Sequence, residues 1–130
     1  MIDIAACRAY LQRRKRQRDQ ERETLRQQIM QAIRTAVPPV LAAFPQVRRA
    51  YVFGSMVRPE AILRDDSDID VAIEGTLDAE TYFALWREME RAIPGRIVEV
   101  VELGQDPPFA ERVRRTGVMI YERADSGPES

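Results

Sequence analysis

The strongest constraint on the fold is a long stretch of the chain that lacks helix breakers. Residues 2–37 contain neither proline nor glycine and are rich in residues of high helix propensity, and Asp3 stands where an N-cap is expected. Apolar side chains recur every four residues from Leu25 to Ile33, whereas residues 12–24 carry none. This pattern predicts a long helix that packs on the protein through its second half and is solvated on all sides in its middle.

Prolines and glycines divide the rest of the chain into short segments. Pro38 and Pro39 are expected to end the long helix, and residues 40–44 to form a separate helical turn. The periodicity predicts strands over residues 48–53, 69–73, 97–103 and 118–121, and helices over residues 78–93 and 109–116. This order predicts a fold of the α/β (α+β) class, with a single mixed β-sheet flanked by helices and a long N-terminal helix.

The charge is distributed unevenly along the chain. Residues 1–36 carry nine basic and four acidic side chains, and the remainder carries eleven and seventeen. We therefore expect a basic arm over residues 1–37, a compact domain over residues 38–123 and a disordered tail over residues 124–130. The net charge of −1 argues against direct nucleic-acid binding. The basic arm suits an acidic partner or a homodimer formed through the helix.

The composition excludes several kinds of chemistry. There is no histidine, which removes the Ser-His-Asp and Cys-His triads and zinc–histidine hydrolysis. The only lysine, Lys15, lies in a polar run outside any phosphate-loop motif, and the only cysteine is Cys7. No apolar run approaches the length of a membrane span, so we expect a cytoplasmic protein without a membrane partner. Any reaction must depend on carboxylates, hydroxyls, arginines and oxygen-bound metal ions.

The first candidate motif is an apolar strand that runs into Gly54-Ser55. Glycine lets the backbone approach a ligand closely, and amides that open a helical turn point their donors at an anion. Ser55 adds a hydroxyl donor. Taken alone, the motif also fits a simple strand-ending turn.

The second motif is acidic. Residues 65–70 contain four aspartates, of which Asp68 and Asp70 stand two apart at the start of a strand and project from one face. Such carboxylates repel each other unless a hard divalent cation lies between them. A solvated acidic turn is the alternative.

The third motif lies in the apolar segment 97–103, which carries Glu99 and Glu102 on opposite faces. One of them is therefore able to join Asp68 and Asp70, unless this is an edge strand with both acids in water. If the strand ending at Phe53 runs antiparallel to the strand starting at Ile69, all these groups share one edge of the sheet. That arrangement predicts a phosphate-binding turn beside a two-metal site for in-line attack on an α-phosphate.

These residues resemble a known family. Gly54-Ser55, then Asp68-x-Asp70 and an acidic residue in a later strand are similar to the polymerase-beta-like nucleotidyltransferase superfamily. Residues 51–55, 67–71 and 117–122 look like its minimal, MNT-type members, and the resemblance covers residues 38–123. It implies the nucleotidyltransferase fold.

The resemblance also implies an activity and a partner. The activity is magnesium-dependent transfer of a nucleoside monophosphate, usually AMP from ATP, to an acceptor hydroxyl. Gly54, Ser55 and Arg58 would hold the triphosphate. Asp68, Asp70 and Glu99 would bind two Mg²⁺ ions and form the catalytic set, with Glu99 as the base. Minimal members commonly act as antitoxins beside a helical HEPN ribonuclease toxin, some of them by adenylylating a tyrosine of the toxin.

The sequence departs from the family at three positions. The usual motif is Gly-Ser-Arg-x-Arg-Gly, but here Met56 replaces the first arginine and Pro59 the last glycine. Glu99 stands where aspartate is usual. These departures favour the first of two other functions that stay open. The first is a catalytically degenerate binding or antitoxin module that masks a partner, and the second is a nucleotidyltransferase for a small molecule.

Overall fold

The computed structural model describes residues 3–64 and 67–124. Its helices are α1 (Ile4–Ala42), α2 (Ala79–Ala92) and α3 (Pro107–Thr116), and its strands are β1 (Arg49–Phe53), β2 (Ile69–Glu74), β3 (Val98–Glu102) and β4 (Val118–Glu122). Two short 3₁₀ turns, η1 (Gly54–Val57) and η2 (Leu103–Gln105), follow β1 and β3. The predicted order of helices and strands is confirmed, whereas η2 was not predicted. Of the expected tail, residues 125–130 lie outside the described residues.

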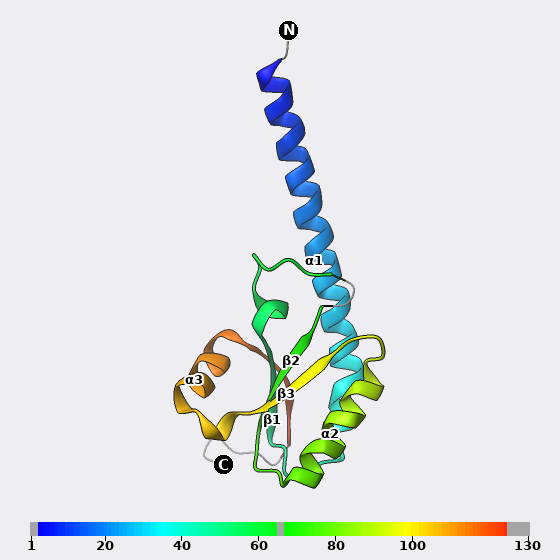
Figure 1. The fold of residues 1–130 in the computed structure, drawn as a ribbon, viewed down its shortest axis with the longest axis vertical. Helices are drawn as coiled ribbons and strands as arrows, with labels where there is room; N and C mark the ends of the chain where they lie inside the picture. The colour runs from blue at the N-terminus through cyan, green and yellow to red at the C-terminus, as the bar shows by residue number, and fades with distance from the viewer. Residues whose placement is uncertain (1–2, 65–66, 125–130) are drawn as a thin grey trace.

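The four strands form one mixed sheet in the order β3-β2-β1-β4. Strand β1 is antiparallel to both β2 and β4, and β2 is parallel to β3. Figure 1 shows α2 and α3 at opposite sides of these strands. The predicted fold class, a single mixed sheet flanked by helices, is confirmed.

The two faces of the sheet bury different amounts of apolar surface. The larger core joins α1 and α2 to the sheet and includes the fully buried Ile33, Val52 and Leu85. The smaller core lies under α3 and includes Tyr51 and Ala72. Alternation along β2 places Asp70 on the face of Ala72, where it is half-buried. The α3 side of the sheet is thus the side that carries polar groups.

The predicted break at Pro38 and Pro39 is wrong, because α1 continues through both prolines to Ala42. Each proline removes one backbone donor and disfavours helix at the preceding residue. However, Val37 and Leu41 extend the buried four-residue stripe of α1 and are both fully buried. Burial of two such side chains is worth about 3–6 kcal/mol, which is enough to hold the last turns in helical form.

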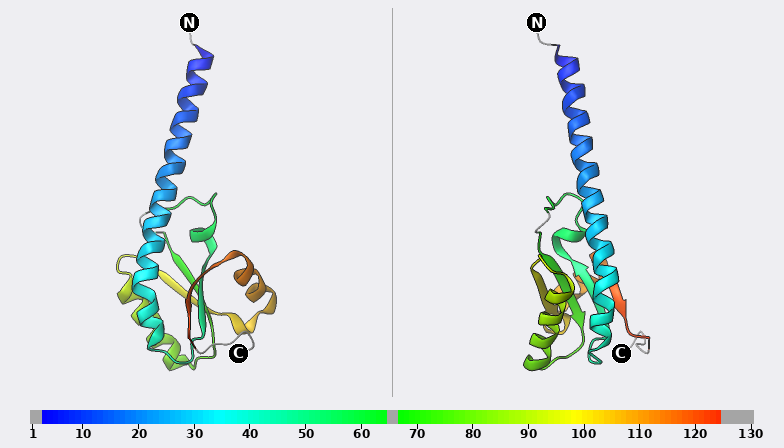
Figure 2. Two further views of the ribbon diagram at one scale, coloured as in Figure 1. Left: turned by 180° about the vertical axis from the view of Figure 1, so that it is seen from behind. Right: turned by 90° about the vertical axis from the view of Figure 1, so that its right-hand side faces the viewer.

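The N-terminal half of α1 extends far beyond the rest of the molecule (Figures 1 and 2). The Asp3 side chain caps it by accepting a hydrogen bond from the Ala6 amide at 3.2 Å, as predicted. The buried residues of α1 begin only at Ile29, and residues 10–21 are all exposed. The predicted division into a solvated half and a packed half is confirmed. No helix within residues 3–64 and 67–124 combines the length and apolar character that crossing a membrane requires.

Candidate active site

The end of β1 and the start of β2 meet at one edge of the sheet, as the antiparallel prediction requires. Phe53 is the Cα partner of Asp70, so the turn after Phe53 lies beside the Asp70 side chain. Gly54 has a φ of +76°, and a Cβ built on it would lie 2.5 Å from Asp70 Oδ2. Only glycine fits between this backbone conformation and the carboxylate. Asp65 and Asp66, the other two aspartates of the acidic run, lie outside the described residues.

The parallel pairing of β2 with β3 decides which glutamate joins the aspartates. Asp70 is the Cα partner of Glu99, and paired residues of neighbouring strands project from the same face. Glu99 therefore stands next to Asp70, whereas Glu102 belongs to the opposite face. The alternative was an edge strand with both glutamates in water. Strand β3 is an edge strand and Glu99 is exposed, so this much of the alternative is also correct. We call Asp68, Asp70 and Glu99 the acidic cluster.

The acidic cluster alters the titration of its central member. Burial raises the pKa of Asp70 above its ordinary value of 3.8, and the charge of Glu99 and a hydrogen bond with it raise the pKa further. The charge of Asp68 also raises the pKa of Asp70, whereas the charge of Arg58 lowers it. Removing a carboxylate from water and surrounding it with negative charge both favour the protonated form. Among the described residues, the balance of these effects therefore favours the protonated form of Asp70.

The donor set of the acidic cluster fits a hard divalent cation, because three carboxylates supply only oxygen ligands. Among the described residues, no group of three or more Asp, Glu, His or Cys side chains is already drawn together closely enough to hold a metal ion. The side chain of Asp68 is exposed and precedes β2 rather than lying within it. The assignment of Asp68, Asp70 and Glu99 as metal ligands therefore stays a prediction.

The turn η1 carries the candidate phosphate-binding residues. The Arg58 amide donates a hydrogen bond to the Ser55 carbonyl at 3.2 Å, which closes the turn. Within the described part of the chain, the Ser55 hydroxyl makes no hydrogen bond, so it is available to a ligand. Met56, which stands where the family has arginine, is fully buried in the larger core.

A side chain from α1 holds this turn in place. Arg26 donates hydrogen bonds from Nε to the Met56 carbonyl at 3.0 Å and from a terminal nitrogen to the Arg58 carbonyl at 2.7 Å. Its other terminal nitrogen forms an ion pair with Glu23 at 2.7 Å. The Arg26 side chain is only 12% exposed. Sequence reasoning assigned no role to Arg26, because no local pattern shows that an arginine reaches a turn thirty residues later.

A cavity of about 340 Å³ opens beside Gly54 and η1, and we call it the arginine cavity. Its walls come from β1, η1 and α3 and include two cations, Arg58 and Arg112. On α3, Phe109, Arg112 and Thr116 contribute to the lining. These residues of α3 were not among the predicted site residues. Spacings of three and four residues place them on one side of a helix, but this pattern does not show which part of the domain that side faces.

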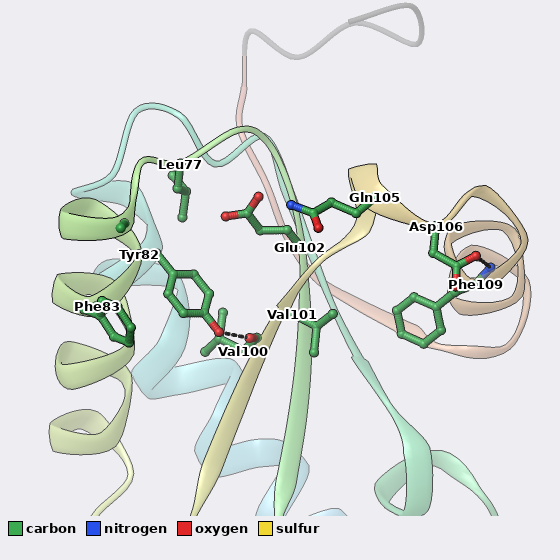
Figure 3. A pocket seen from close by; sticks show the side chains of 10 residues that line it. Leu77, Tyr82, Phe83, Val100, Val101, Glu102, Gln105, Asp106 and Phe109 are labelled. Atoms are coloured by element: carbon green, nitrogen blue, oxygen red, sulfur yellow. Dashed lines mark hydrogen bonds between the residues drawn. The ribbon is translucent and has the colours of Figure 1, made fainter.

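A second cavity, of about 740 Å³, lies on the other side of Phe109, and we call it the aromatic cavity (Figure 3). Tyr82 and Phe83 of α2 form one side, and β3 and Phe109 form the others. The Tyr82 hydroxyl donates a hydrogen bond to the Val100 carbonyl on the outer edge of β3. The acidic residues that line the aromatic cavity are Glu102 and Asp106, and none of its described lining residues is cationic.

Trp86 makes a second contact of this type with the outer edge of β3. Its indole N–H donates to the Val98 carbonyl at 2.5 Å, two residues before the carbonyl that Tyr82 reaches. The Trp86 ring is partly buried and packs against the larger core. Side chains of α2 therefore satisfy the carbonyls of an edge strand that would otherwise be free to pair.

The chain is similar to proteins of known family and structure. Residues 36–126 match the family model described as Polymerase beta, Nucleotidyltransferase. A crystal structure of a toxin-antitoxin with AMP-PNP is 22% identical, with 76% of this chain and 74% of that chain covered and a TM-score of 0.50. A protein from Sulfolobus solfataricus, whose nucleotidyltransferase name is provisional, is 22% identical, with 78% and 86% covered and a TM-score of 0.51. No curated protein matches the sequence.

Proposed function

The chain belongs to the polymerase beta nucleotidyltransferase family, and on that premise we propose that it transfers AMP from ATP to a hydroxyl of a partner protein. The acidic cluster and the turn after β1 are the catalytic site of this proposal. The observation that carries it is the packing of the Asp70 carboxylate against Gly54, with Glu99 beside it on the neighbouring strand. Phosphate-binding backbone and carboxylates thus lie within a few ångströms of each other.

Each residue has a distinct role in the proposed reaction. Gly54, Ser55 and Arg58 bind the triphosphate, since a backbone without a side chain, a hydroxyl and a guanidinium are good phosphate partners. Asp68, Asp70 and Glu99 would hold Mg²⁺, which supplies charge stabilisation to a phosphoryl group when bound.

The acceptor hydroxyl oxygen forms a bond to the α-phosphorus, and the bond between that phosphorus and the bridging oxygen to the β-phosphate breaks. Pyrophosphate leaves with the bonding electrons, and Glu99 takes the proton of the hydroxyl. The exposed position of Glu99 suits this role, because it leaves room for an acceptor side chain.

The partner in this proposal is a helical toxin of the HEPN type. Support comes from the structural similarity to a toxin-antitoxin that was crystallised with AMP-PNP. The projecting half of α1 offers an extended surface for such a partner, with exposed apolar side chains at Ile4 and Leu11. Pairing of two copies through the same helix, and location in the cytoplasm, stay predictions.

The proposal is tested by incubating the protein with Mg²⁺, ATP labelled at the α-phosphate, and the candidate helical partner encoded beside it. We expect the partner to become labelled, and labelling to disappear in the Asp68→Ala, Asp70→Ala double variant. ATP labelled at the γ-phosphate should leave the partner unlabelled. Glu102→Gln, which alters an acid on the other face of β3, is the matched control and should label normally. Equal labelling by the double variant would overturn the proposal.

A second candidate function is a binding module without catalysis. The buried position of Met56 favours it, because this side chain cannot replace the missing arginine at the phosphates. This candidate predicts that calorimetry detects no affinity for Mg²⁺–ATP, while the complex with the partner forms equally well with the double variant. Labelling of a small molecule in the absence of any partner would instead favour the small-molecule transferase.

A further inference from the structure

We propose that Arg112 of α3 acts with Arg58 to form a phosphate-binding site in the arginine cavity, which takes the β- and γ-phosphates of the nucleotide and then the pyrophosphate product. The inference rests on the proposed function for the identity of the nucleotide. It adds a residue from a helix outside the motifs that the sequence analysis identified.

The charge of the arginine cavity supports an anionic ligand. Among its described lining residues, Arg58 and Arg112 are the cations, and Glu60, which is exposed, is the single carboxylate. In the part of the chain that the structure describes, neither guanidinium forms an ion pair within 4 Å. Arginine binds phosphate through short, charge-assisted hydrogen bonds that are often bidentate. Two unpaired guanidinium groups at one cavity are therefore suited to a polyphosphate.

The Arg112 side chain is oriented by an aromatic neighbour. Its guanidinium carbon lies 5.9 Å from the centroid of the Phe109 ring, and this ring packs edge-on against Phe53 with a centroid distance of 5.3 Å. Cation–π contact leaves the N–H groups at the edge of the guanidinium free to donate to a ligand. Through Phe109, Arg112 is thus in indirect contact with Phe53, the last residue of β1, which directly precedes Gly54.

The position of the arginine cavity suits the β- and γ-phosphates, which leave as pyrophosphate, rather than the α-phosphate, which is attacked. Gly54 lines the cavity and also lies against Asp70, so the cavity and the acidic cluster adjoin at Gly54. A triphosphate whose α-phosphate lies at the acidic cluster would therefore extend past Gly54 toward the two arginines. The aromatic cavity suits these phosphates less well, because its described lining residues include Glu102 and Asp106 but no lysine or arginine.

The test measures binding of inorganic tripolyphosphate by isothermal titration calorimetry in EDTA, so that no metal ion contributes. Arg112→Gln should weaken binding about tenfold or more, the usual effect of losing a charge-assisted hydrogen bond. Arg112→Lys, which keeps the charge, should weaken it less. Arg115→Gln is the matched control, since Arg115 is exposed on the same helix but does not line the cavity. Unchanged thermal unfolding should show that all variants are folded.

The outcomes separate this inference from the proposed function. If the wild-type protein does not bind tripolyphosphate, or if Arg112→Gln and Arg115→Gln weaken binding equally, the inference is wrong, whatever the labelling experiment shows. If tripolyphosphate binds through Arg112 but the partner is never labelled by ATP, the phosphate site stands and the proposed transfer is wrong.

Discussion

At the scale of single residues, the central observation is that Asp70 is held in an environment that disfavours its charge. Burial, Glu99 and Asp68 all raise its pKa in the folded protein. Because the folded pKa lies above the unfolded one, the contribution of Asp70 to stability is fully present below the ordinary pKa and is lost as the pH rises through the folded pKa. The negative charge that the proposed reaction needs thus destabilises the fold at neutral pH.

Asp70→Asn removes that charge and keeps a side chain able to donate a hydrogen bond to Glu99. We expect the variant to unfold at a higher temperature than the wild type at pH 7, and the difference to disappear well below the ordinary pKa of 3.8. Partner labelling should fall about a hundredfold or more, as for loss of a group that stabilises the transition state. Thermal unfolding from pH 3 to pH 8 is the measurement.

Asp78→Asn is the matched control and should show the opposite sign. Hydrogen bonds from Thr81 lower the pKa of Asp78, so the stability that its charge contributes is present above the ordinary pKa and is lost as the pH falls. The variant should therefore be less stable than the wild type at pH 7. A lower unfolding temperature for Asp70→Asn at pH 7 would contradict the interpretation of the site.

Gly54 and Gly95 allow the effect of backbone strain to be separated from the effect of contact. Both have a positive φ, of +76° and +84°, so alanine should cost about 1–2 kcal/mol of unfolding free energy at each. A Cβ at Gly54 would also meet Asp70 Oδ2 at 2.5 Å, whereas nothing lies within 4 Å at Gly95. We expect Gly54→Ala to be the less stable variant in urea unfolding and the only one that loses labelling. Equal activity of the two variants would show that the close approach to Asp70 is unimportant.

Site residues that belong to local sequence motifs could be predicted, whereas residues that reach the site only through the packing of distant elements could not. Gly54 and Asp70 could be identified because each motif is local, and a single antiparallel pairing brings them together. Alternation alone did not choose between Glu99 and Glu102; the family resemblance named Glu99, and the register of β2 with β3 places Glu99 beside Asp70. Arg112 could not be assigned, because its relevance depends on where α3 packs rather than on the residues beside it.

At the scale of elements, α1 combines two halves with different energetics. The predicted four-residue stripe is buried from Ile29 onwards, and it continues through Pro38 and Pro39 because tertiary packing outweighs the local preference of proline. A sequence pattern reports only the local effect of proline on the backbone. It does not show that Leu41 is buried in the larger core, which compensates for that effect. The predicted existence and type of each helix and strand were therefore more reliable than this one boundary.

The two halves of α1 should respond differently to change. Ile33 is fully buried in the larger core, so Ile33→Ala should lower the unfolding free energy by about 2–5 kcal/mol. Deletion of residues 2–22 removes no buried residue among those that the structure describes, and the protein should keep a cooperative transition within about 1 kcal/mol of the wild type. Chemical denaturation followed by circular dichroism measures both. Loss of the cooperative transition on deletion would show that the projecting half is needed for folding.

At the scale of the whole molecule, Arg26 connects the arm to the candidate site. It binds two carbonyls of the segment that carries Ser55 and Arg58, and it pairs with Glu23 at the base of the projecting helix. A partner seated on the arm would therefore lie next to the residue that holds the phosphate-binding turn. A partner that moves Arg26 would therefore alter the position of the phosphate-binding turn, and no strand of the sheet would need to move.

Arg26→Met tests this connection, because it keeps an apolar side chain of similar length and removes all three donors. The Met56 and Arg58 carbonyls then lose their partners, which should lower the unfolding free energy by about 1–3 kcal/mol. It should also weaken tripolyphosphate binding, measured at a temperature where the variant is fully folded. Arg34→Met is the matched control, since Arg34 is exposed on the same helix and makes no hydrogen bond or ion pair among the described residues. If Arg26→Met lowers stability but leaves tripolyphosphate affinity unchanged, then Arg26 anchors α1 to the domain and does not position the turn for phosphate.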